Sequence, residues 1–99
     1  MQLKSTVKLA DLKPQIVLAT VIASEVYRKF GQELVITSLD DSVHHPGSLH
    51  PSGYAFDLRT SYFMADQIPK VLSALKQALT LDFDVIFEND HFHIEYDPK

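Results

Sequence analysis

The feature of this 99-residue chain that most constrains its fold is a strict alternation near the C-terminus, in the segment HFHIEY from residue 91 to residue 96. Successive side chains of a β-strand point to opposite faces, so Phe92 and Ile94 belong to one face and His91, His93 and Glu95 to the other. Residues 84–87 form a second short apolar run, and the intervening residues 88–90 match a tight hairpin connection. The pattern therefore predicts an antiparallel pair with one buried and one polar face.

Apolar periodicity predicts the remaining elements. Residues 12–30 carry apolar side chains on more than one stripe, which is typical of a central, largely buried helix that ends at Gly31. Residues 34–37 form a short apolar run that predicts a buried strand, and a polar loop over 38–52 follows. Residues 54–59 alternate as a strand. Asp66 is expected to cap a second helix with a single apolar face.

One domain over residues 1–99 fits this chain length. The expected fold class is α+β, with helices packed on a small antiparallel sheet. A net charge of −4, without any cluster of lysine and arginine, argues against nucleic acid as a partner. The longest apolar stretch is too short to span a membrane, and the N-terminus does not resemble a signal peptide. We therefore expect synthesis and folding in the cytoplasm, no membrane partner and a monomer.

Two short segments concentrate metal-binding chemistry. The first is HPSGYAFD over residues 50–57, and the second is ENDHFH over residues 88–93. The chain has no cysteine, so any metal must be held by nitrogen and oxygen ligands. Catalytic zinc uses three protein ligands and leaves a fourth position open. His50, Asp57 and one of His91 or His93 satisfy that count.

The two segments resemble the signatures of a known enzyme family. Residues 48–58, SLHPSGYAFDL, are similar to the SxHxxGxAxDL motif of the zinc D-Ala-D-Ala carboxypeptidases and related peptidoglycan endopeptidases. His91 and His93 match the HxH motif of the same family, in the same order and with a helix between the two motifs. The resemblance extends over residues 12–97 and implies the fold that these peptidases share with the signalling domain of hedgehog proteins.

The resemblance also implies roles for individual residues. His50, Asp57 and His93 take the positions of the zinc ligands, with His91 beside the metal to stabilise the oxyanion. Some family members instead carry Glu-x-x-His, and Glu88 and His91 also fit this spacing, which would make His91 the third ligand. The HxH reading is favoured because the match continues into the residues that follow His93.

The implied reaction is metal-assisted hydrolysis of peptide bonds in peptidoglycan stem peptides, with Glu88 as the proton acceptor. Ser48 and His45 lie in or near the first motif and are candidates for substrate binding. The family commonly has an arginine shortly after the position of Ser38, where this chain has LDDS. Arg59, on the strand face of Asp57, is a candidate replacement for binding a substrate carboxylate.

Two functions follow from this reading of the sequence. The first is a Zn²⁺-dependent cell-wall peptidase of a bacterium or bacteriophage, which would reach the wall after release from the cell. The second is a noncatalytic zinc module of the same fold that serves a structural or binding role. A base at Glu88 and an oxyanion partner at His91 favour the enzyme, because a pure binding module needs neither.

Overall fold

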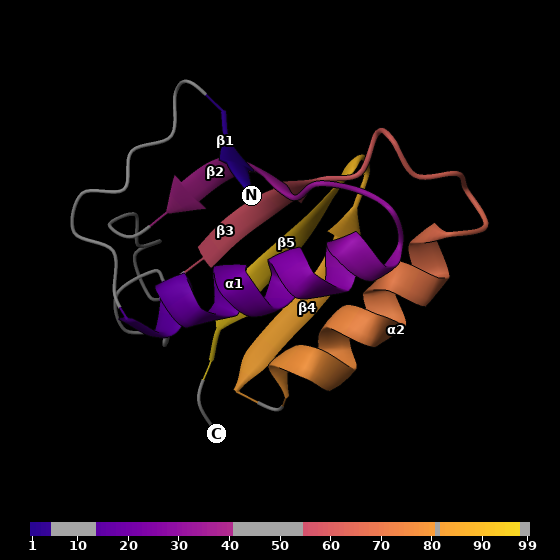
Figure 1. Cartoon of the computed structure of the whole chain (residues 1–99). Coiled ribbons are helices and arrows are strands. Elements are labelled where there is room, and N and C mark those ends of the chain that lie inside the picture. The colour runs from indigo at the N-terminus through magenta and orange to yellow at the C-terminus, as the bar shows by residue number, and fades with distance from the viewer. Residues whose placement is uncertain (5–13, 41–54, 81, 98–99) are drawn as a thin grey trace.

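The computed structural model describes residues 1–4, 14–40, 55–80 and 82–97. Two helices pack on one face of a mixed five-stranded sheet, so the molecule has the α+β architecture expected from the sequence (Figure 1). The strand order is β1-β2-β3-β5-β4. In chain order the elements are β1 (Gln2–Leu3), α1 (Pro14–Lys29), β2 (Val35–Asp40), β3 (Ala55–Arg59), α2 (Ile68–Leu79), β4 (Phe83–Glu88) and β5 (His91–Tyr96).

The sheet is not wholly antiparallel, which corrects the expectation from the sequence. β1 pairs with β2 in parallel, whereas the β2–β3, β3–β5 and β4–β5 pairs are antiparallel. β2 also continues through Ser38 to Asp40, where a loop was predicted. A bulge between Ile36 and Ser38 shifts the register there, which allows a polar residue to continue a strand that began as an apolar run.

The helix α1 is less buried than its apolar composition suggested. Ala19, Ala23 and Tyr27 lie in the core, but the side chain of Leu18 is 61% exposed. The helix therefore covers the sheet with one stripe and presents another apolar stripe outward. Its predicted end is confirmed, since Gly31 follows Lys29 and adopts a φ of +80° that favours glycine.

The helix α2 presents a single apolar face, as predicted. Val71, Leu75 and Leu79 are buried and repeat at four-residue spacing. The prediction that Asp66 caps this helix is wrong, because Gln67 occupies the N-cap position and no side chain caps it. Instead, the side chain of Gln67 accepts a hydrogen bond from the backbone N–H of Met64.

The predicted alternation in the sheet is confirmed on both central strands. Phe56 and Leu58 of β3 and Phe92 and Ile94 of β5 are buried beneath the helices. The intervening side chains lie on the opposite face of the sheet, which neither helix covers and which we call the open face. The open face carries Asp57, His91, His93 and Glu95 among its described residues.

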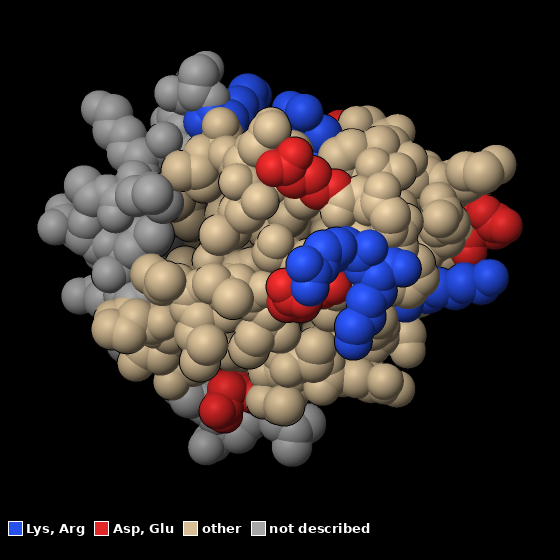
Figure 2. All heavy atoms as spheres, in the orientation of Figure 1, with Lys and Arg blue, Asp and Glu red and all other residues tan. Residues whose placement is uncertain are grey.

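The described part of the chain contains no helix that is long and apolar enough to cross a membrane. Figure 2 shows the face that carries the helices: lysine, arginine, aspartate and glutamate side chains form small groups on a mostly uncharged surface.

Candidate metal and peptide site on the open face

Adjacent strands bring Asp57 and His93 together at the centre of the open face. They are direct cross-strand partners between β3 and β5, and the His93 Nδ1 atom lies 2.8 Å from Asp57 Oδ1. The two residues are 36 positions apart in the chain, so only the antiparallel pairing of the two strands makes them neighbours. Two of the three predicted zinc ligands are therefore in contact.

The other carboxylate oxygen of Asp57 faces the second histidine. His91 Nε2 lies 3.8 Å from Asp57 Oδ2, and His91 Nδ1 lies 3.1 Å from the Asp90 carboxylate. Both imidazoles thus share one aspartate, with His93 at the shorter distance. Which of the two histidines is the third zinc ligand stays a prediction. The contribution of Asp90 was missed at the sequence level, although its position next to His91 was a signal.

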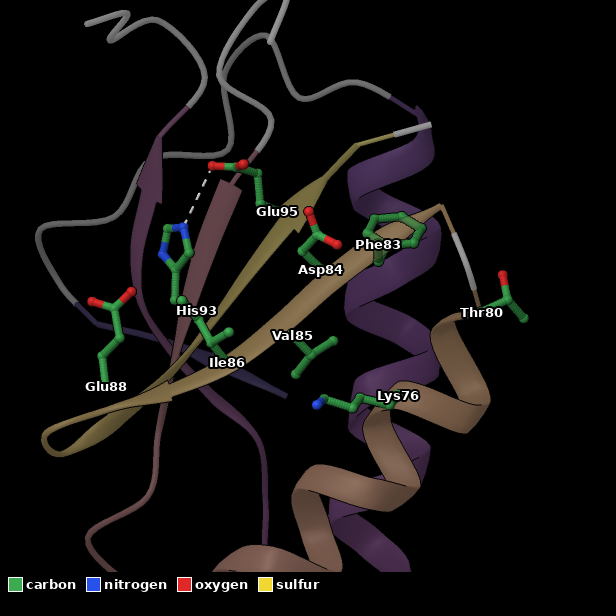
Figure 3. Close-up of a pocket in the computed structure, with 9 residues that line it drawn as sticks. All are labelled: Lys76, Thr80, Phe83, Asp84, Val85, Ile86, Glu88, His93 and Glu95. Carbon is green, nitrogen blue, oxygen red and sulfur yellow. Dashed lines mark ion pairs between the residues drawn. The ribbon is translucent and has the colours of Figure 1, made fainter. Parts of the chain in front are cut away.

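A second carboxylate flanks His93 on its other side. His93 Nε2 lies 3.6 Å from Glu95 Oε1, a contact drawn as the dashed line in Figure 3. The pKa of His93 is raised above 6.5, and the hydrogen bond to Asp57 is the largest cause. Burial of the ring lowers the pKa and opposes this effect. The charges of Asp57 and Glu88 and the contact with Glu95 add to the rise. Both ring nitrogens of His93 therefore face carboxylate oxygens, and these two contacts set the orientation of the ring.

Glu88 and Arg59 lie in the cross-strand row next to Asp57 and His93. His91 pairs with Glu88 on one side and with Arg59 on the other. The Glu88 side chain is exposed and lies with His93 along the wall of one groove (Figure 3). Arg59 is half-buried, and its carbonyl accepts a hydrogen bond from the Tyr27 hydroxyl, which fixes the end of β3 to α1.

Three predicted site residues lie outside the described residues. These are His45, Ser48 and the expected zinc ligand His50. Among the described residues, no group of three or more histidine, aspartate and glutamate side chains is arranged to hold a metal ion. The chemistry of the donors present nevertheless suits zinc, since a carboxylate and an imidazole are two of its ordinary ligands and they lie side by side on an accessible sheet face.

Ser38 and Thr37 are site neighbours that the sequence analysis did not identify, and Ser38 falls in the predicted loop. Ser38 is exposed and pairs with Asp57 across the β2–β3 ladder, while the Thr37 hydroxyl donates a hydrogen bond to the Asp57 carbonyl. The pairing of Ser38 depends on the continuation of β2 beyond the apolar run. Both contacts hold the backbone at Asp57 from the side opposite to β5.

Comparisons of this chain with family models, with curated proteins and with solved structures found no match.

Proposed function

We propose that this protein is a zinc-dependent peptidase that hydrolyses peptide bonds in peptidoglycan stem peptides, with the fold of the D-Ala-D-Ala carboxypeptidases and hedgehog domains. The single observation that supports this most strongly is the contact between Asp57 and His93. These residues come from the two separate motifs that resemble the family signatures, and they meet at 2.8 Å. The cross-strand pair thus joins one residue of each motif on the same face of the sheet.

Asp57 and His93 would hold the metal together with His50. When bound, zinc would supply a Lewis acid that polarises the scissile carbonyl and makes a water molecule more acidic. The carboxylate of Asp57 would leave the site with a net positive charge, which favours an oxyanion. The contact of Glu95 with His93 would keep the ring in a fixed orientation.

The remaining side chains of the open face would handle protons and charge. Glu88 is exposed on the strand next to His93 and would take a proton from the attacking water and deliver it to the departing amine. His91, in its cross-strand pair with Glu88, would donate to the oxyanion of the tetrahedral intermediate. Arg59, on the far side of His91, is the candidate for a substrate carboxylate.

The test is digestion of purified peptidoglycan by zinc-loaded protein, with mass spectrometry of the released fragments and a chelator control. Glu88→Gln is expected to bind zinc normally and to lose about 10²- to 10⁴-fold in hydrolysis, since that is the usual contribution of a general base. Asp57→Asn is expected to lose zinc as well. Asp66→Asn, which removes an exposed carboxylate at the start of α2, is the matched control and should retain both properties.

Each outcome has a defined meaning. Full activity of Glu88→Gln would remove Glu88 from the mechanism. Stoichiometric zinc binding without any cleavage of peptidoglycan would favour the noncatalytic zinc module. Failure of the unmodified protein to bind zinc would overturn the proposal as a whole.

A further inference from the structure

The strand β4 lies at the edge of the sheet and has no partner on its outer side among the described residues. The strand order places β5 on its inner side and nothing beyond it. An edge strand of six residues exposes backbone N–H and C=O groups that can pair with another extended chain. Natural edge strands are protected by short length, covering elements, proline, bulges or charged side chains, and of these β4 has only the charges of Asp84 and Glu88, with neither proline nor a bulge.

The hydrogen-bonding pattern identifies which residues of β4 point outward. The backbone N–H of Asp97 donates to the carbonyl of Asp82 at 2.7 Å, so these two residues form a hydrogen-bonded pair between the two chain segments. Hydrogen-bonded pairs alternate along an antiparallel ladder, which assigns Asp84, Ile86 and Glu88 to the β5 side. The backbone groups of Val85 and Phe87 therefore point away from the sheet.

A groove is lined mainly by residues of β4. It has a volume of about 740 Å³, and its walls come from both sides of β4 (Figure 3). Lys76 and Thr80 of α2 lie on the side of the helices, and His93 and Glu95 lie on the open face. A chain that paired with β4 would thus be bordered on both faces and would pass beside the candidate metal site.

The side chains of β4 on the open face favour a peptide of a particular sequence pattern. Ile86 is 48% exposed and is flanked at two-residue spacing by the exposed carboxylates of Asp84 and Glu88. Cross-strand neighbours pair best when they are apolar with apolar and acidic with basic. The edge therefore complements a strand in which two basic residues flank an apolar one at the same spacing.

The same charges disfavour a second copy of this chain. In an antiparallel β4–β4 pair with matched faces, the register centred on Ile86 sets Asp84 against Glu88 of the other copy. The register centred on Val85 sets Asp82 against Glu88. Like charges directly opposite each other destabilise a ladder, so both registers are unfavourable.

We propose that the outer edge of β4 binds an extended peptide of ordinary L-residues as an added antiparallel strand, with the pattern basic-x-apolar-x-basic. The apolar residue lies opposite Ile86 and the basic residues lie opposite Asp84 and Glu88. Backbone hydrogen bonds to Val85 and Phe87 hold the peptide, and the charges set its register. This proposal does not depend on zinc or on hydrolysis, although it shares Glu88 with the proposed catalytic site.

The test uses the peptide acetyl-Lys-Thr-Val-Thr-Lys-amide and follows backbone amide shifts of the full chain by NMR. The amide signals of Val85 and Phe87 are expected to shift most. N-methylation of both threonines removes the two hydrogen bonds toward β4 and should weaken binding about tenfold, whereas N-methylation of the valine, whose N–H points outward, should be tolerated. Equal binding of the two N-methylated peptides, or shifts centred away from β4, would overturn the proposal.

Charge reversal tests the register and the direction of the peptide. In the antiparallel arrangement the last lysine lies opposite Asp84. Asp84→Lys should weaken binding of the original peptide by about threefold, which is the usual effect of losing an exposed ion pair. The variant protein should bind more tightly to a peptide with glutamate at the last position. A preference for glutamate at the first position instead would contradict the antiparallel register. Sedimentation of the free protein should show a monomer, and a dimer that the peptide dissociates would assign the edge to a second copy.

Discussion

His93 lies between two carboxylates, and this position decides how the site responds to pH. The hydrogen bond to Asp57 raises the pKa of His93 above 6.5 in the metal-free protein, against the opposing effect of burial. A raised pKa means that the protonated ring is stabilised in the folded state. The stabilisation is fully present below about pH 6.5 and is lost as the pH rises through the higher folded-state value.

Metal binding has the opposite dependence on pH, because zinc needs the neutral imidazole. We predict that NMR titration of the metal-free protein gives His93 a pKa above 6.5 and that Asp57→Asn lowers this value. Zinc affinity should rise with pH over the range in which His93 loses its proton. An unchanged pKa of His93 in Asp57→Asn would show that the contact with Asp57 does not form in solution.

At the scale of single elements, the end of α2 contains a strained residue. Thr80 follows the last turn with φ 66° and ψ −169°, a region of the backbone map that is occupied almost only by glycine. Its N–H donates to the carbonyl of Lys76, so the conformation closes the helix. Thr80→Gly should therefore raise the free energy of unfolding by about 1 kcal/mol, as measured by urea denaturation.

Thr80→Ala is the matched control for this substitution. It removes the hydroxyl and the methyl group but keeps the Cβ atom, which is the source of the strain. Its stability should stay close to that of the unmodified chain. If alanine stabilised as much as glycine, the threonine side chain rather than the backbone would be the cause.

The turn between β4 and β5 is tied to the rest of the sheet by a buried hydroxyl. Thr60 directly follows β3, is 4% exposed, and donates a 2.6 Å hydrogen bond to the carbonyl of Asp90. We predict that Thr60→Val, which keeps the shape of the side chain, lowers the free energy of unfolding by about 1 kcal/mol. Thermal unfolding measures this loss. An unchanged stability would mean that water replaces the hydroxyl at Asp90.

The elements that the sequence predicted well are those with a strict short period. On β3 and β5 a two-residue period fixes which side chains are buried, and Asp57 and His93 consequently fall on the same face. β1 could not be predicted, because it consists of two residues and exists only through pairing with a strand more than thirty positions away. The end of β2 was missed for a related reason, since Ser38 faces the open side and is polar there.

At the scale of the whole molecule, the main hydrophobic cluster of the described residues lies between the sheet and the two helices. The layer between the sheet and the helices contains the aromatic rings of Tyr27, Phe63 and Phe92, which meet edge to face at 5.0 and 6.5 Å between ring centres. The other side of the sheet carries Asp57, His91, His93 and Glu95, beside the apolar Ala55 and Ile86. This division explains why a chain of 99 residues can place several ionisable groups on its two central strands.

In a two-layer molecule, residues of the same type can differ widely in how much they contribute to the free energy of unfolding. Leu18 and Leu75 are both leucines in apolar helices, and apolar content alone places both in the core. Leu75 of α2 is fully buried against the other helix and the sheet, whereas Leu18 of α1 is 61% exposed. Deletion of a buried leucine side chain loses its transfer free energy and leaves a cavity, but deletion of an exposed one does neither.

Leu75→Ala should therefore lower the free energy of unfolding by about 2–5 kcal/mol. Leu18→Ala should change it by no more than about 0.5 kcal/mol. Urea denaturation of the two variants beside the unmodified protein gives the comparison, with equal slopes as the sign that both still unfold in one step. A large loss for Leu18→Ala would mean that the outer stripe of α1 is covered in solution, and the molecule would then have a third layer or a partner on that side.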